Sequence, residues 1–188
     1  MKQLIIMSLE PIESRYTKEW FTHLPKVFKE KLGDEFEVIQ LDGETKSGKV
    51  TKGAFLDFEA TNIWKAEQII KFFQLMKLDR IQDDAFILFT DAWNPGVNQI
   101  KYTKELCNKN WTLIGIWHAG AYDPNDFLGR IDRIHWAYVT EKSFYEAYDI
   151  NWFATNFHKR LFFRTHKMFA LFKAYVSGFP MEYIRNIK

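Results

Sequence analysis

Cysteine is almost absent from this sequence, and so are the patterns that bind metal ions. The single cysteine, Cys107, excludes an internal disulfide and a cysteine-rich zinc site. Because Cys107 falls within a predicted helix, we expect it to be a packing residue and not a nucleophile. The chain contains no H-E-x-x-H pattern and no close group of histidine and acidic residues. The sequence therefore predicts no bound metal.

Long apolar runs and a strong net charge are missing as well. No run approaches the ~20 residues that a membrane-spanning helix needs. The apolar segment after Met1 ends at Glu10 and lacks the pattern of a secretory signal. The formal net charge of +2 gives no global basic field of the kind that favours nucleic-acid binding. We therefore expect a cytoplasmic protein that does not span a membrane.

Glycine-rich phosphate loops are absent too. The segment Gly43 to Val50, G-E-T-K-S-G-K-V, has the G-x-x-x-x-G-K frame of a phosphate loop. However, Val50 stands where Ser or Thr would ligate magnesium, and no apolar helix follows it. No G-x-G-x-x-G sequence occurs, which argues against a dinucleotide cofactor and against a flavodoxin-like or other nucleotide-binding protein. We predict no cofactor.

Aromatic residues, by contrast, are abundant. The chain has 188 residues, of which 18% are aromatic, including 18 Phe and 7 Trp. This share is explained either by a core filled with rings or by rings that line a groove or partner surface. The length predicts one domain or two small ones. We expect one domain over residues 1–175, followed by a terminal segment over residues 176–188.

Apolar runs alternate with segments of helical spacing along the chain. We expect strands near 4–7, 36–41, 85–89, 111–117, 136–139 and 152–154, and helices near 17–31, 61–78, 97–108, 125–131, 141–148 and 155–175. This alternation is typical of parallel strands joined by right-handed crossovers. The sequence therefore predicts a Rossmann-like, three-layer α/β domain with a mainly parallel sheet.

The stretch from Trp111 to Asp123 predicts where a functional site would lie. Its apolar run, typical of a fully buried strand, stops at His118. Ligands of open α/β sheets bind at the carboxyl ends of the strands. His118 is our candidate general base, with Asp91 or Asp123 to orient it. The alternative is a structural histidine that bonds to the backbone.

Several loops expected at the same edge carry polar side chains that suit a polyhydroxylated or phosphorylated ligand. These residues are Glu10, Glu13, Arg15, Asp91, Asn94, His118, Tyr122, Asp123, Asn156 and His158. Helix capping is the alternative for three of them: Asp91 and Asn94 precede one predicted helix, and Asn156 begins another.

The segment from Phe157 to Lys173 combines aromatic and basic residues. It could contact the phosphates of a nucleic acid or an acidic partner. The alternative is a solvated helix face whose opposite side packs on the sheet.

Five segments, taken in order, resemble a known family. They are E-S-R-Y-T-K-E-W (13–20), F-T-D-A-W-N-P-G (89–96), H-A-G-A-Y-D-P-N-D-F (118–127), A-T-N-F-H-K (154–159) and V-S-G-F-P (176–180). Together they resemble the N-terminal, acceptor-side domain of phage and bacterial glycosyltransferases with two Rossmann-like domains, the GT-B fold. The resemblance covers nearly the whole chain.

This resemblance implies transfer of a sugar from a nucleotide sugar to a hydroxyl acceptor, which could be a modified nucleic-acid base, a glycan or a small metabolite. It puts His118 near the reaction centre. It also implies that Glu13, Arg15 and Tyr16 contact acceptor or donor phosphate, that Thr155 and Asn156 line the cleft, and that residues 176–180 cross to a second domain.

The family's donor site lies mostly in that second domain, which this sequence does not contain. The resemblance therefore implies a missing C-terminal domain, a partner subunit or a homo-oligomer, and weak or no activity for this chain alone. The alternative, from another functional class, is a non-catalytic interaction module that uses the aromatic and basic segment near the C-terminus.

Overall fold

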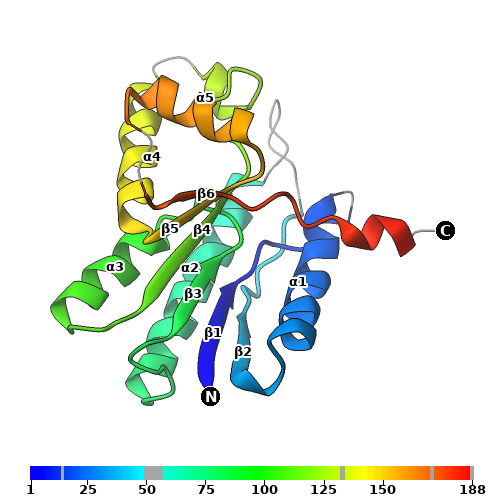
Figure 1. Cartoon of the computed structure of the whole chain (residues 1–188), viewed down its shortest axis with the longest axis vertical. Coiled ribbons are helices and arrows are strands. Elements are labelled where there is room, and N and C mark those ends of the chain that lie inside the picture. Colours follow the sequence, from blue (N-terminus) through cyan, green and yellow to red (C-terminus); the bar gives the residue numbers. More distant parts are fainter. Residues whose placement is uncertain (14, 49–56, 132–133, 170–171, 187–188) are drawn as a thin grey trace. The chain divides into compact units, whose positions relative to one another are not determined.

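Figure 1 shows a computed structural model of the protein, which describes residues 1–13, 15–48, 57–131, 134–169 and 172–186. The chain divides into two compact units. Unit 1 comprises residues 1–90 and 179–188, and unit 2 comprises residues 91–178. The terminal segment expected at 176–188 is thus divided between them.

Unit 1 is a parallel βαβαβ arrangement. Its main elements are β1 (Lys2–Met7), α1 (Tyr16–Leu32), β2 (Phe36–Leu41), α2 (Phe58–Lys77) and β3 (Phe86–Phe89). The strand order is β2-β1-β3, and both pairings are parallel. The chain leaves β1 in one direction and returns past it in the other, so right-handed crossovers put α1 and α2 on opposite faces. Unit 1 therefore has three layers.

Buried aromatic rings form the core of unit 1, and particular residues fix where its helices begin and end. The indoles of Trp20 and Trp64 are almost fully buried. The α1 helix ends at Gly33, whose positive φ of 54° favours glycine. The α2 helix begins three residues earlier than expected because Asp57 caps it by accepting a hydrogen bond from the backbone N–H of Ala60. Near the C-terminus, Phe179 packs on Trp20 with a centroid distance of 4.6 Å.

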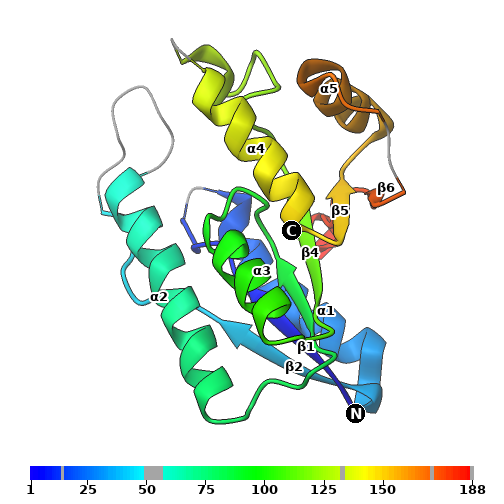
Figure 2. The same ribbon diagram turned by 90° about the vertical axis from the view of Figure 1, so that its left-hand side faces the viewer.

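Unit 2 contains a second parallel set of strands. Its main elements are α3 (Gly96–Leu106), β4 (Thr112–Trp117), α4 (His135–Ala147), β5 (Ile150–Phe153), α5 (Asn156–His166) and β6 (Ala174–Val176). The order is β4-β5-β6, again parallel, and these elements can be followed in Figure 2. The β4 and β5 crossovers run in the same direction, so α4 and α5 share a face. Tyr145 of α4 accordingly packs on Phe162 of α5.

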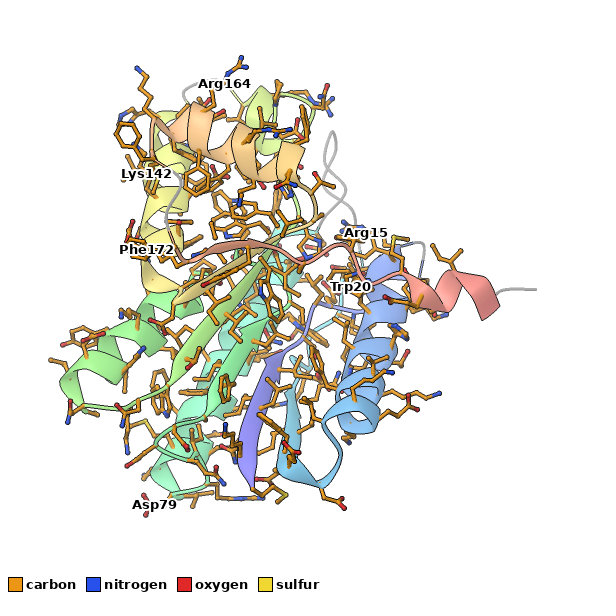
Figure 3. The ribbon with its side chains drawn as sticks, in the orientation of Figure 1. Arg15, Trp20, Asp79, Lys142, Arg164 and Phe172 are labelled. Atoms are coloured by element: carbon orange, nitrogen blue, oxygen red, sulfur yellow. The ribbon has the colours of Figure 1, made fainter. Side chains whose placement is uncertain are left out.

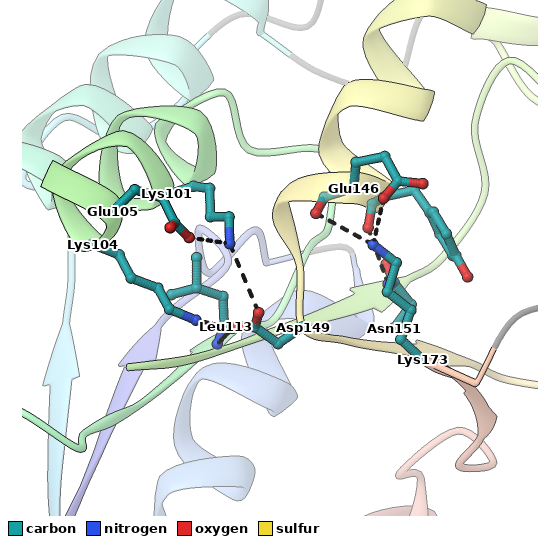
Figure 4. Close-up of polar contacts among 9 residues, drawn as sticks. Lys101, Lys104, Glu105, Leu113, Glu146, Asp149, Asn151 and Lys173 are labelled. Carbon is teal, nitrogen blue, oxygen red and sulfur yellow. Dashed lines mark hydrogen bonds and ion pairs between the residues drawn. The ribbon is translucent and has the colours of Figure 1, made fainter. Parts of the chain in front are cut away.

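A polar network closes the amino-terminal end of β4 and β5 (Figure 4). Asp149 precedes β5, and its Oδ2 atom accepts hydrogen bonds from the backbone N–H of Leu113 at 2.9 Å and from Lys104 Nζ at 2.7 Å. Lys173, beside β6, donates to Glu146 at 2.8 Å. These bonds lie at the strand ends opposite the predicted site.

The Rossmann-like α/β class with parallel strands is confirmed, whereas several element predictions were wrong. Residues 136–139, expected to form a strand, belong to α4. The helical region expected over 155–175 stops at His166, and its last residues form β6. The helix expected at 125–131 is only a short 3-10 turn, Leu128–Arg130. Cys107, expected to pack, is exposed at the end of α3. Among the helices of the described ranges, none is long and apolar enough to cross a membrane.

Candidate functional site

Two neighbouring strand ends bring the predicted side chains of unit 2 together. Trp117, the last residue of β4, pairs in register with Phe153, the last residue of β5. The chain continues from these positions into His118 and, after Ala154, into Thr155. The carboxyl edge of β4 and β5 therefore gathers residues that lie almost forty positions apart in the sequence. We call His118, Tyr122 and His158 at this edge the ring cluster.

Tyr122 and His158 form a bonded and stacked pair. The hydroxyl of Tyr122 is hydrogen-bonded to Nε2 of His158, and the two rings lie 5.4 Å apart at an interplanar angle of 28°. The imidazole also contacts the ring of Phe153 edge-on at 5.4 Å. His158 is thereby held against the end of β5.

The protonation states of this pair follow from burial. Burial, followed by the neighbouring charge of His118, lowers the pKa of His158 from 6.5 to about 4, against an opposing effect of Asp123. Burial, together with the carboxylates of Glu141, Asp126, Asp123 and Asp91, raises the pKa of the Tyr122 hydroxyl well above its usual value. At neutral pH the tyrosine is therefore protonated and donates to a neutral imidazole.

These protonation states limit what His158 can do chemically. An imidazole whose pKa is about 4 is a weak proton acceptor at neutral pH, and the Tyr122 hydroxyl already occupies its Nε2 atom. His158 is therefore suited to orienting groups. His118 is half-buried at the end of β4 and lies close enough to affect the pKa of His158. The assignment of His118 as the general base stays a prediction.

The remaining predicted residues of unit 2 make mostly local bonds. Asp91 Oδ1 accepts from the backbone N–H of Trp93 at 3.0 Å, and Asn94 Oδ1 accepts from that of Gly96 at 3.0 Å. Both bonds shape the turn that precedes α3. Neither side chain caps the helix, whose N-cap is Pro95 without a side-chain hydrogen bond, so the capping interpretation of Asp91 and Asn94 was wrong. Asp91 also lies near enough to contribute to the raised pKa values of Tyr122 and Tyr148.

The start of α5 differs from the expected cap. Its N-cap is Thr155, whose hydroxyl accepts a hydrogen bond from the backbone N–H of His158 at 3.1 Å. Asn156 is the first helical residue and is exposed. Thr155 thus positions the backbone of His158 directly. Asp123 closes the preceding turn by accepting from the backbone N–H of Asn125 at 2.9 Å.

Glu13, Arg15 and Tyr16 belong to unit 1, around the start of α1. Glu13 is exposed and forms an ion pair with Lys18 at 2.6 Å. Arg15 occupies the N-cap position, and its guanidinium lies 5.9 Å from the ring of Tyr16. Figure 3 labels Arg15 and Trp20 on this helix. Tyr16 packs edge-on against Trp20 and Phe179, with ring centroids 5.4 Å apart in each pair. Its ring therefore belongs to the packing of unit 1.

Sequence reasoning missed the carboxylate beneath the ring cluster. Glu141 of α4 is 0% exposed and accepts hydrogen bonds from Trp93 Nε1 and from the backbone N–H of Ala121. It also pairs with His166 Nε2 at 2.8 Å. One signal could have revealed it. Glu141 shares a helical face with Ala137, Phe144 and Tyr145, so an acidic residue stands within an apolar stripe.

The described residues contain no group of three or more His, Cys, Asp or Glu side chains arranged to hold a metal ion. The segment from Gly43 to Val50, which has a phosphate-loop frame, lies partly outside the described residues. Neither a protein-family model nor a curated protein sequence matches this chain.

Proposed function

We propose that the chain is the acceptor-side part of a glycosyltransferase, which moves a sugar from a nucleotide sugar to a hydroxyl acceptor in the cytoplasm. The observation that carries this proposal is the ring cluster. It joins a half-buried histidine to a fixed tyrosine–histidine pair at the carboxyl ends of two parallel strands. The parallel α/β fold is compatible with the same activity, although a fold alone does not identify one.

In this reaction His118 takes the proton of the acceptor hydroxyl. The hydroxyl oxygen forms a bond to the anomeric carbon of the sugar while the bond from that carbon to the phosphate oxygen breaks. The electron pair of the broken bond leaves with the nucleoside diphosphate. The hydrogen-bonded pair of Tyr122 and His158 lies near this base. A second domain or subunit would supply most of the donor contacts, so this chain binds the donor weakly.

Ligand binding and transfer by the full chain test this function. A panel of nucleotide sugars and hydroxyl acceptors, including glucosides and hydroxymethylated nucleosides, is screened by saturation-transfer NMR and by release of nucleoside diphosphate. We expect His118→Ala to lose acceptor binding and any release. His135→Ala is the matched control, because His135 is exposed at the start of α4 in the same unit. Equal binding by the parent and His118→Ala would remove the role of His118, and no binding by the parent would overturn the function.

One observation favours a second candidate, a non-catalytic interaction module. Three phenylalanines of the aromatic and basic segment are open to solvent: Phe157 is 70% exposed, and Phe169 and Phe172 are each 89% exposed. Arg160, Arg164 and Lys167 are exposed in the same segment, and Figure 3 labels Arg164 and Phe172. Contiguous exposed apolar patches of several hundred Å² mark contact surfaces, and we infer that these three rings contribute to one. Light scattering should then show self-association that Phe169→Ser and Phe172→Ser abolish. A parent that stays monomeric at all concentrations and binds no acidic partner would exclude this reading.

A further inference from the structure

Glu141 is the most enclosed acidic residue among those described, and its carboxylate joins four segments of unit 2. Both Trp93 Nε1 and the backbone N–H of Ala121 donate to Oε1, at 2.9 and 2.6 Å. His166 Nε2 lies 2.8 Å from Oε2. The carboxylate of α4 thus meets the turn before α3, the loop after β4 and the end of α5.

Two of these segments also carry the ring-cluster residues. The loop bonded through Ala121 holds His118 and Tyr122, and α5, bonded through His166, holds His158. The same loop is tied to α5 a second time, because the hydroxyl of Thr165 donates to the backbone carbonyl of Tyr122 at 3.3 Å. One carboxylate therefore fixes both halves of the Tyr122–His158 pair.

The loop is also shaped to admit this carboxylate. A Cβ atom added at Gly120 would overlap Oε1 of Glu141 and would lie 2.7 Å from Trp93 Nε1. Only a residue without a side chain leaves room for the loop to lie directly on the carboxylate. Gly120 and Glu141 thus form one complementary contact.

A purely structural role would not require a carboxyl group at this buried position. Buried polar groups are costly to desolvate even when they are paired, and apolar residues of similar volume often replace such pairs without loss of stability. Both side chains of the Glu141–His166 pair are 0% exposed, and Nδ1 of His166 has no hydrogen-bond partner among the described residues. Burial of Glu141 and His166 therefore costs stability in the core. The geometry of Glu141 instead suits the loop, which it binds through the Ala121 N–H.

We propose that Glu141 is a positioning residue, which holds the loop from His118 to Asp123 in place and so sets Tyr122 against His158. The consequence for catalysis rests on the proposed function, whereas the positioning itself does not. Loss of the carboxylate frees the loop and leaves the strands of unit 2 formed.

Residue-resolved hydrogen exchange of the full chain tests this positioning. We expect Glu141→Ala to lower the protection of the Ala121 amide by about tenfold or more, since its hydrogen bond to the Glu141 side chain is lost. Amides of β4 and β5 should keep their protection. Glu141→Gln should have a smaller effect, because its amide oxygen still accepts from Trp93 and Ala121. Glu146→Gln is the control, an exposed glutamate of the same helix that pairs with Lys173.

A second readout follows the ring cluster itself. Once the loop is released, the pKa of the His158 imidazole, measured by NMR, should rise from about 4 toward 6.5, because Tyr122 and part of the burial are lost. If Glu141→Ala does not fold, Gly120→Ala breaks the same contact from the loop side and should give the same pattern.

Unchanged protection at Ala121, or an equal loss across all of unit 2, would overturn the positioning role. Failure of the proposed function looks different. In that case the parent binds none of the nucleotide sugars or acceptors, while the exchange pattern of Glu141→Ala still decides the role of Glu141.

Discussion

At the scale of single residues, burial gives the ring cluster its chemical character. Two histidines, His118 and His158, stand at one strand edge, and the pKa of His158 is lowered to about 4. His158 is kept neutral because desolvation disfavours its charged form, and the neutral ring accepts a hydrogen bond from Tyr122. The positions of these residues were predictable from the strand ends. The low pKa of His158 was not, because it depends on burial that only the folded chain defines.

Removal of the Tyr122 hydroxyl tests this pair. Tyr122→Phe deletes a donor to neutral His158, so the pKa of His158 should rise from about 4 toward 6.5. The lost hydrogen bond should cost about 1 kcal/mol in the free energy of unfolding. NMR titration and urea denaturation measure the two quantities. Tyr102→Phe is the control, since Tyr102 is largely exposed. A His158 titration that Tyr122→Phe leaves unchanged would contradict the bond.

The depressed pKa of His158 also predicts how stability depends on pH. Between about 4 and 6.5 the unfolded chain binds a proton at this position and the folded chain does not. The contribution of His158 is therefore present above pH 6.5 and is lost as the pH falls toward 4. Because the ring is partly exposed, we expect a loss of about 1–3 kcal/mol. His158→Gln should lack this component in denaturant titrations across the range, and a parent–variant difference that does not vary with pH would contradict the assignment.

At the scale of elements, the local sequence of α4 favours a strand, whereas its tertiary packing favours a helix. Trp136, Tyr138 and Val139 favour strands, which is why a strand was expected there. Ala137, Glu141, Phe144 and Tyr145 instead form the buried face of one helix. The burial of Glu141 was not predicted, because a single glutamate between polar neighbours is typical of a solvent-exposed position. The continuous apolar run of β4, in contrast, is recognisable without any tertiary information.

Asp149 gives a prediction for the opposite end of β4 and β5. Its carboxylate accepts from the Leu113 backbone and from Lys104, and its side chain is 34% exposed. Asp149→Ala should lower the free energy of unfolding by about 1–3 kcal/mol, because the Leu113 N–H loses its charged acceptor. Glu105→Ala, which breaks only a surface pair with Lys101, is the control. Altered His118 or His158 NMR signals in Asp149→Ala would show that the two strand ends are coupled, contrary to this account.

At the scale of the whole molecule, the order of strands and helices was predictable and the division of the chain was not. Alternating apolar runs and helical segments indicate parallel βαβ units directly. The assignment of residues 179–188 to unit 1 depends on Phe179 packing with Trp20 and Tyr16, and no local pattern reveals that contact. The predicted site residues follow the same division. Those after β4 and β5 are gathered in unit 2, while Glu13, Arg15 and Tyr16 lie in unit 1.

The five histidines provide the most direct test of the central claim that the ring cluster is a ligand site. The full chain, labelled with ¹⁵N in its imidazole rings, is titrated with nucleotide sugars and hydroxyl acceptors. We predict that His118 and His158 shift on ligand addition, while His23, which faces Glu182 in unit 1, and exposed His135 do not. If His118 and His158 stay unchanged while the chain binds a ligand, or if all five histidines shift alike, the ring cluster is not the site.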